Sequence, residues 1–290
     1  MTLPRHDDFR FLNPLRVRWA EVDQQRVVFN AHYLTYFDIA ITDYWRALAV
    51  PYELSMPGLG GEPFVRKATV EFHASARLDD QLEVGLRCAR IGNSSMGFVG
   101  GIFRDEQLLI SGELVYVFAN PHTATATPLP QPLREIMLGY EAWEPMTRIE
   151  IGSWAVLGPE LASVRNEDAA HPLLAGEDAR DATALHALAR NRLGLAIGCG
   201  RLLAPDAPGG PARIDRLGVR RVLRGSHFGR SLLQALMRAA GERGDPRVEV
   251  QASRGSRGFF ERHGFEPAGE PFERTGQVLT PLRHIVHSPT

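Results

Sequence analysis

The chain has 290 residues, 44% hydrophobic and 23% charged, with a formal net charge of −1. This length favours two domains of ordinary size, and the near-zero charge argues against a nucleic-acid partner. No apolar run reaches the roughly 18 residues of a membrane-spanning helix, and residues 1–12 lack the apolar core of a signal peptide. The cysteines, Cys88 and Cys199, are too far apart in the sequence to favour a structural disulfide, which fits a reducing compartment. The sequence therefore predicts a globular, cytoplasmic protein without a membrane span.

The first half of the chain predicts one long helix followed by antiparallel strands. From Asn30 to Leu48 apolar residues recur at helical spacing, and Pro51 ends the run. We expect the Asn30 side chain to cap this helix, and residues 56–63 to form a loop. Alternation of apolar and polar residues predicts strands over 67–73, 82–88, 96–103 and 108–119. One helix and about five strands indicate an antiparallel sheet wrapped on a single helix.

The second half of the chain has a different rhythm. Four prolines predict an extended connector over residues 120–132, followed by a short helix at 133–143. Strand-like and helix-like segments then alternate, which indicates an α/β domain. We expect strands at 149–157, 195–203, 213–219 and 247–252, and helices at 181–190, 228–242 and 255–262. The predicted domains are residues 1–143 and 146–290.

Two carboxylates stand shortly before the predicted long helix. Asp23 or Glu21 could act as a nucleophile or general base on a nearby electrophile. The helix start at Asn30 offers free N–H groups and a positive dipole end, which suit a carbonyl that becomes an oxyanion. This arrangement suits acyl transfer. The spacing alone equally suits two solvated loop acids.

A family resemblance favours the first interpretation. The stretch VRWAEVDQQRVVFNAHYLTYFDIA resembles the opening of hotdog-fold acyl-CoA thioesterases of the 4-hydroxybenzoyl-CoA thioesterase type. The resemblance continues in the family's order over residues 13–120, through RKATVEFHASARLDDQLEV, GNSS and LLISGELVYVFAN. It implies a hotdog fold, an antiparallel sheet wrapped on a long helix, and a homodimer or homotetramer formed through this domain. The matching positions are Asp23, Val27, Asn30, Tyr33, Leu34, Tyr36 and Phe37.

The resemblance also implies roles for individual residues in the hydrolysis of an acyl-CoA, with no metal or other cofactor required. The Asp23 carboxylate would attack the carbonyl or activate water, and N–H groups near Asn30 and Ala31 would polarise the carbonyl. Many relatives carry Gly where Arg26 stands, so we expect an altered turn or substrate there. Further candidates are Glu21 and His32 as catalytic helpers, and Tyr33, Ser94 and Ser95 as substrate contacts. A salt-bridged acid, a surface histidine and an ordinary hairpin turn are the alternatives for Glu21, His32 and the two serines, respectively.

The richest stretch of the second half is RIDRLGVRRVLRGSHFGRSLLQALMRAAGERG. Its strand, Arg- and Gly-rich loop and helix start form a cradle for an anion, while the sparse aromatics argue against nucleic acid. The stretch resembles the pyrophosphate-binding motif of GNAT-type N-acetyltransferases, and the resemblance spans residues 149–286. His227 departs from a common Gly, and Phe260 departs from a Tyr that protonates the CoA thiolate in many members. The implied acetyl-CoA contacts are Leu217, Val219, Arg224, Gly225, Ser226, His227, Phe228, Gly229 and Arg230.

We therefore expect an α+β protein in which a hotdog acyl-CoA thioesterase-like domain is fused to an α/β GNAT-like domain. The expected function is acyl-CoA hydrolysis at Asp23, with acetyl-CoA a candidate ligand of the second domain. Two alternatives stay open: a non-catalytic acyl-CoA- or CoA-binding assembly protein, and an N-acetyltransferase acting through the second domain. The acyl group, the acceptor amine and the choice between CoA and a carrier protein are left open by these motifs.

Overall fold

The computed structural model describes residues 3–168 and 174–286. The chain divides into two compact units, Met1–Met146 and Thr147–Thr290. Within the described ranges, no helix is both long enough and apolar enough to cross a membrane.

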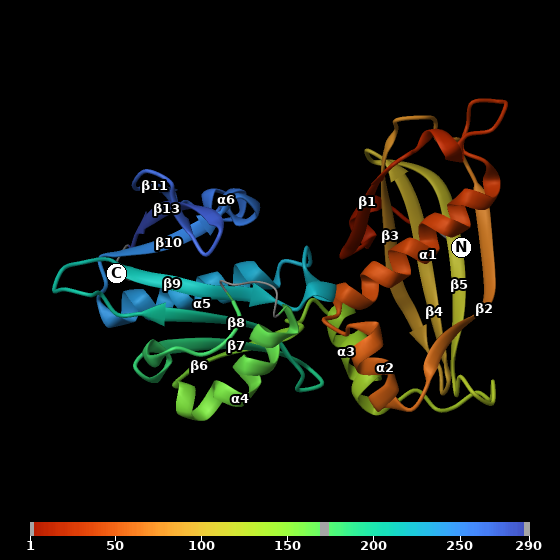
Figure 1. Cartoon of the computed structure of the whole chain (residues 1–290). Helices are drawn as coiled ribbons and strands as arrows, with labels where there is room; N and C mark the ends of the chain where they lie inside the picture. The colour runs from red at the N-terminus through yellow and green to blue at the C-terminus, as the bar shows by residue number, and fades with distance from the viewer. Residues whose placement is uncertain (1–2, 169–173, 287–290) are drawn as a thin grey trace. The chain divides into compact units, whose positions relative to one another are not determined.

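The N-terminal unit is a five-stranded antiparallel sheet with strand order β1-β3-β4-β5-β2. The helix α1 lies along one face of this sheet (Figure 1). The expected hotdog arrangement, one long helix wrapped by an antiparallel sheet, is confirmed. The elements are β1 (Phe11–Arg16), α1 (Asn30–Ala47), α2 (Tyr52–Leu59), β2 (Glu62–Phe72), β3 (Gln81–Ile91), β4 (Ser95–Arg104), β5 (Gln107–Ala119) and α3 (Gln131–Glu141).

Two glycines let α1 approach the sheet closely. Gly100 on β4 lies opposite Gly112 on β5. A Cβ atom at Gly112 would lie 2.8 Å from the Phe37 ring, and a Cβ atom at Gly100 would overlap the same ring. The face of α1 that packs here is apolar and aromatic, and it buries Tyr33, Tyr36, Phe37, Ala40, Ile41, Tyr44 and Trp45. The helix therefore packs closely on the sheet because the two glycines leave space for the Phe37 ring, and because the face of α1 that meets the sheet is apolar.

The loop expected at residues 56–63 is wrong. Helix α2 continues to Leu59 with Pro57 inside it, and β2 already begins at Glu62. Gly60, with φ of +77°, ends the helix in the left-handed conformation. Helix α2 is not predicted by the sequence, because its Pro- and Gly-rich composition favours a loop, whereas the break between α2 and β2 is confined to Gly60 and Gly61.

The C-terminal unit is an eight-stranded sheet with the order β11-β13-β10-β9-β8-β7-β6, and β12 pairs with β13. Strands β9 and β10 are parallel, whereas the other pairs are antiparallel. The elements are β6 (Thr147–Gly152), α4 (Trp154–Arg165), β7 (Leu185–Asn191), β8 (Ala196–Leu203), β9 (Ala212–Val219), α5 (Phe228–Arg243), β10 (Arg247–Ser253), α6 (Arg254–Glu261), β11 (Glu266–Pro267), β12 (Phe272–Arg274) and β13 (Gln277–Ile285).

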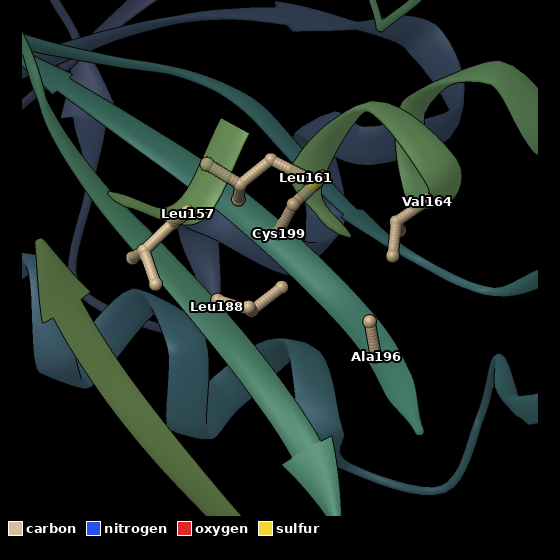
Figure 2. Close-up of a cluster of buried hydrophobic side chains, with 6 residues drawn as sticks. All are labelled: Leu157, Leu161, Val164, Leu188, Ala196 and Cys199. Atoms are coloured by element: carbon tan, nitrogen blue, oxygen red, sulfur yellow. The ribbon is translucent and has the colours of Figure 1, made fainter. Parts of the chain in front are cut away.

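Helices α4 and α5 cover opposite faces of this sheet. On β8, a Cβ atom at Gly198 or Gly200 would meet Leu232 or Leu236 of α5 at 2.7 Å. The intervening Cys199 belongs to a buried cluster with Leu157, Leu161 and Val164 of α4 and Leu188 and Ala196 of the sheet (Figure 2). Because neighbouring residues of a strand point to opposite faces, the two helices lie on either side of β8.

Two expectations for this unit are wrong. Residues 149–157 are not one strand, because β6 ends at Gly152 and α4 begins at Trp154. Residues 181–190 are not a helix: most of them form β7, which lies between β6 and β8 with Ala187, Leu188 and Ala189 buried. The Ala- and Leu-rich composition favours a helix, but burial on both faces of a sheet overrides a propensity of a few tenths of a kcal/mol per residue.

A buried ionic cluster ties α4 to the sheet. Arg165 donates to both carboxylate oxygens of Asp181, at 3.0 and 3.1 Å, and its other terminal nitrogen lies 3.3 Å from His186 Nδ1. Arg201 of β8 donates to Asp181 at 2.9 Å and to Asp215 of β9 at 2.7 Å. Burial alone would raise the pKa of Asp181, but these cations and the Asp178 amide hold it below its usual value. Removing one arginine would leave a buried carboxylate short of a partner.

Candidate active site

The candidate site begins with a tight turn. Val22 and Val28 pair as an isolated antiparallel bridge. Between them the Asp23 amide donates to Val27 O, and the Arg26 amide donates to Asp23 O, both at 2.9 Å. Because α1 starts only two residues after Val28, this turn holds Asp23 near the helix start.

The two oxygens of the Asp23 carboxylate have different environments. Oδ1 accepts the Gln25 amide at 2.8 Å and the Val27 amide at 3.4 Å. Oδ2 receives no hydrogen bond from the described residues, and the side chain is half-buried. One oxygen therefore orients the carboxylate, and the other stays available for chemistry.

Arg26 keeps the backbone conformation that a glycine would favour. Its φ is +61°, in the left-handed region, and its side chain is exposed. The substitution of Arg for Gly therefore does not require another backbone path, at an expected cost of about 1–2 kcal/mol. The expectation of a different turn at this position is not supported by the backbone.

The start of α1 differs from the prediction in one respect. The helix begins at Asn30 as expected, but Phe29 is the N-cap and no side chain caps the helix. Asn30 is therefore the first helical residue and not the cap, because the extended backbone of an N-cap is found at Phe29, with φ of −61° and ψ of 133°. The Phe29 amide donates to the Glu21 carbonyl at 2.9 Å. The His32 amide donates to Phe29 O at 2.9 Å. In the described part of the chain this leaves the amides of Asn30 and Ala31 without a partner.

Glu21 is a buried, ion-paired acid. Its side chain accepts the Arg18 amide at 2.8 Å, Arg18 Nε at 2.7 Å and the Tyr36 hydroxyl at 2.7 Å. Burial pushes the pKa of Glu21 upward, but these hydrogen bonds and the Arg18 charge hold it below its usual value. Glu21 is thus ionised and saturated with donors, which favours a structural role over proton transfer. Tyr36, which the sequence indicated only as a match to the family, is the partner that this reasoning missed. A tyrosine at a core position of a helix is the signal for it, because a buried hydroxyl needs a partner.

The remaining candidates of the first constellation lie in different places. Tyr33 is a core residue whose hydroxyl accepts the Ala76 amide at 3.0 Å. The half-buried His32 ring packs edge-on against Phe29 and has no hydrogen bond to Asp23 among the described side chains.

The two candidate serines lie at the far end of the sheet within one protomer. Val27 bridges Arg77, four residues before β3 begins, whereas Ser94 and Ser95 follow the end of β3. At about 3.3 Å per residue, the 11 residues of β3 span roughly 36 Å. One protomer therefore does not bring the serines to Asp23. Their backbone carbonyls instead accept the amides of Phe118 and Gly92, both at 2.7 Å.

The C-terminal unit contains a second helix start with open amides. His227, with φ of +66°, is the N-cap of α5, and its side chain is exposed. The Arg230 amide donates to His227 O at 3.1 Å, and the amides of Phe228 and Gly229 have no partner within the described ranges. Beside this loop, Arg224 Nε donates to Val219 O at 3.3 Å.

Strands β9 and β10, which lie next to this helix start, pair only at their beginnings and then separate. The paired residues are Ala212–Val248 and Arg213–Glu249. The later part of β9, with the half-buried Leu217 and Val219, therefore has an open edge on this side. Phe260 is buried against Phe259 and Phe265 and offers no proton donor. Across residues 3–168 and 174–286, no three His, Cys, Asp or Glu side chains are grouped to hold a metal ion.

Comparison with known proteins gives a separate match for each unit. A family model described as the thioesterase superfamily matches residues 25–111, and one described as an acetyltransferase (GNAT) domain matches residues 177–286. Proteins named acyl-CoA thioester hydrolase YbgC, from Escherichia coli O6:H1 and Shigella flexneri, are each 31% identical over 122 residues. These matches cover 41% of this chain and 88% of each relative.

A solved structure also resembles the chain. The PA5185 protein from Pseudomonas aeruginosa is 26% identical, with 48% of this chain and 96% of that chain covered and a TM-score of 0.42. By the two family models, each half of the chain matches the family that its sequence motifs resemble.

Proposed function

The chain belongs to the thioesterase superfamily through its N-terminal unit, and on this premise we propose that it hydrolyses acyl-CoA thioesters at Asp23 and the start of α1. One observation carries this proposal. Among the described residues, a carboxylate with one anchored and one open oxygen is held by a short turn shortly before a helix whose first two amides have no partner. This combination supplies a nucleophile or base and a pair of oxyanion donors.

In the proposed reaction the thioester carbonyl oxygen accepts hydrogen bonds from the amides of Asn30 and Ala31. Negative charge grows on this oxygen as the tetrahedral intermediate forms, and each such donor typically contributes about 3 kcal/mol to the transition state. The positive end of the α1 dipole acts in the same direction.

Asp23 Oδ2 then has two possible roles. As a nucleophile it forms an acyl-aspartyl anhydride and expels the CoA thiolate, and water cleaves the anhydride to a free acid. As a general base it takes a proton from the water that attacks the carbonyl, and the same two products result. The hydrogen bonds to Oδ1 support both routes, because they anchor the carboxylate through one oxygen and leave Oδ2 without a donor among the described residues.

Asp23→Asn tests the proposal, with Asp38→Asn as the matched control on the exposed surface of α1. The amide can still accept the turn hydrogen bonds but is a poor nucleophile and base. We expect kcat for thiol release to fall by about 100-fold or more in Asp23→Asn and to be unchanged in Asp38→Asn. Equal kcat values in the two variants would remove Asp23 from the mechanism.

The N-terminal unit also supports a homodimer or homotetramer. Strand β2 is an edge strand, and Phe64, Val65 and Phe72 on it are 44%, 54% and 53% exposed. An exposed apolar edge of this kind is usually covered by another chain. The mass in solution tests this proposal. We expect two or four times the 32.1 kDa of one chain, and a monomer at micromolar concentration would contradict it.

A second function has its own observation. The C-terminal unit carries a GNAT-type domain, and its β9 edge is open where β9 and β10 separate, next to the open amides of α5. These features support acetyl-CoA binding, with backbone groups of β9 along the pantetheine arm and the helix start at the pyrophosphate. Acetyl transfer has less support, because Phe260 cannot protonate the CoA thiolate. Calorimetry with acetyl-CoA tests the binding, and no heat at millimolar ligand contradicts it.

A further inference from the structure

The carboxylate of Glu21 connects the turn of Asp23 to the start of α1. Its side chain is buried, with 5% of the residue exposed, and the Tyr36 hydroxyl of α1 donates to it at 2.7 Å. Its own carbonyl accepts the amide of Phe29, which directly precedes the helix, at 2.9 Å. Glu21 therefore contacts both the N-cap of α1, at Phe29, and the second turn of the helix, at Tyr36. It lies two residues before Asp23.

This double contact restrains the separation between the Asp23 carboxylate and the first amides of α1, on which the proposed chemistry depends. Along the chain, the open amides of Asn30 and Ala31 lie between the two contact points of Glu21, which are Phe29 at the N-cap and Tyr36 in α1. Movement of residues 21–23 relative to the helix would change the separation between the Asp23 carboxylate and these amides. A misplacement of about 1 Å between reacting groups can cost about 100-fold in rate.

We propose that Glu21 is a positioning residue for hydrolysis, acting through Tyr36 and Phe29 to hold the Asp23 carboxylate in register with the amides of α1. This role rests on the proposed function of the N-terminal unit. Glu21 does not exchange a proton with the substrate in this role, because Arg18 and Tyr36 occupy its carboxylate oxygens. The Arg18 ion pair keeps it ionised and thereby keeps the Tyr36 hydrogen bond charge-assisted.

The same helix contains a matched pair without such a role. The Tyr44 hydroxyl donates to Glu141 of α3 at 2.6 Å, and Glu141 also accepts the Cys88 amide at 2.9 Å. Tyr44 is eight residues beyond Tyr36, about 12 Å further along α1 and away from Asp23. Both tyrosines are buried and both carboxylates accept a backbone amide. Loss of either hydroxyl should therefore destabilise the unit similarly, whereas only Tyr36 serves the site.

The experiment compares Tyr36→Phe, Tyr44→Phe and Glu21→Gln in the full chain. For each we would measure kcat, KM, the urea midpoint and the amide chemical shifts of Asn30 and Ala31. In Tyr36→Phe we expect kcat to fall about 10-fold, KM to change less than about two-fold, and both amide shifts to move. Tyr44→Phe should lower the urea midpoint comparably and leave kcat and the shifts unchanged. Glu21→Gln keeps the side-chain volume and should follow Tyr36→Phe.

The outcomes separate the two proposals. If the wild type releases thiol and Tyr36→Phe keeps its kcat, or if both tyrosine variants lose kcat equally, the positioning role is overturned and the proposed function stands. Amide shifts that move without a change in kcat also overturn the role. A wild type that releases no thiol from any acyl-CoA contradicts the proposed function itself, and the positioning role is overturned with it.

Discussion

The two units of the chain share three backbone features near the start of their long helices, although the positive-φ residue stands at a different distance from each helix. In each, a non-glycine residue adopts a positive φ, the conformation that favours glycine, with +61° at Arg26 and +66° at His227. In each, two amides at the helix start have no partner among the described residues. Each helix also packs over glycines of its sheet. These are Gly100 and Gly112 under α1, and Gly198 and Gly200 under α5.

The units differ in what the turn offers to a ligand. The turn before α1 carries the Asp23 carboxylate, and the Arg26 side chain lies four residues before the helix. The loop before α5 carries Arg224 and Gly225 and no carboxylate, and His227 is itself the N-cap. Under the two proposals, similar open amides would hold a carbonyl beside a carboxylate in one unit and a phosphate beside arginines in the other. The side chains of the turn, rather than the helix start, would then decide the chemistry.

The largest expected effect concerns the glycines under the helices. A Cβ atom at Gly100 would overlap the Phe37 ring, so Gly100→Ala should lower the free energy of unfolding by about 2 kcal/mol. Gly198→Ala should cost about 1 kcal/mol, because the nearest atom, at 2.7 Å, is the end of the flexible Leu232 side chain, and the Gly218 carbonyl oxygen follows at 3.2 Å. Gly97→Ala is the control, with 3.7 Å of space before Arg90. Urea unfolding measures all three, and equal stabilities of the Gly97 and Gly100 variants would contradict the packing argument.

The next effect concerns the second helix start. The exposed imidazole of His227 stands at the N-cap, beside the open amides of Phe228 and Gly229. We expect this imidazole to crowd the pyrophosphate of a bound acetyl-CoA. His227→Gly should remove it and raise the affinity for acetyl-CoA by about 10-fold, or about 1.4 kcal/mol. Calorimetry checks the affinity, and thiol release from an acyl-CoA should stay unchanged. An unchanged or weaker affinity would mean that the imidazole does not obstruct the ligand.

The smallest effect concerns the first turn. Arg26→Gly should relieve about 1–2 kcal/mol of left-handed strain and add about 0.4–1 kcal/mol of freedom to the unfolded chain. We expect the free energy of unfolding to rise by about 0.5–1 kcal/mol and kcat to change less than about two-fold. If kcat instead drops strongly, the Arg26 side chain takes part in the reaction, and the likeness between the two turns ends at the backbone.

Much of the N-terminal unit could be predicted because its signals are local. The helix from Asn30 follows from apolar spacing, and the strands follow from alternation. Two elements of the C-terminal unit were predicted wrongly because their structure depends on packing contacts that the local sequence pattern does not specify. The strand predicted over 149–157 overlaps the start of α4, whose Gly158 lies so close to Trp154 that a Cβ atom there would meet the ring at 3.0 Å. Strand β7 reads as a helix because its burial depends on neighbours distant in sequence.

The candidate site could be predicted in part for the same reason. Asp23 and the helix start are adjacent in sequence, so their proximity follows from local structure. The burial of Glu21 depends on Arg18 and Tyr36 meeting around it, which no spacing rule specifies. Ser94 and Ser95 were predicted as substrate contacts from the family resemblance alone. Within one protomer, the length of β3 separates both serines from Asp23.

Hydrolysis of an acyl-CoA is the activity from which the roles of Asp23 and Glu21 follow. The most direct measurement is thiol release by the full chain from a panel of short-chain, long-chain and aromatic acyl-CoAs, with calorimetric binding measured on the same panel. We predict saturable thiol release from at least one member. Saturable binding without thiol release from any member would contradict this activity and would favour an acyl-CoA-binding protein.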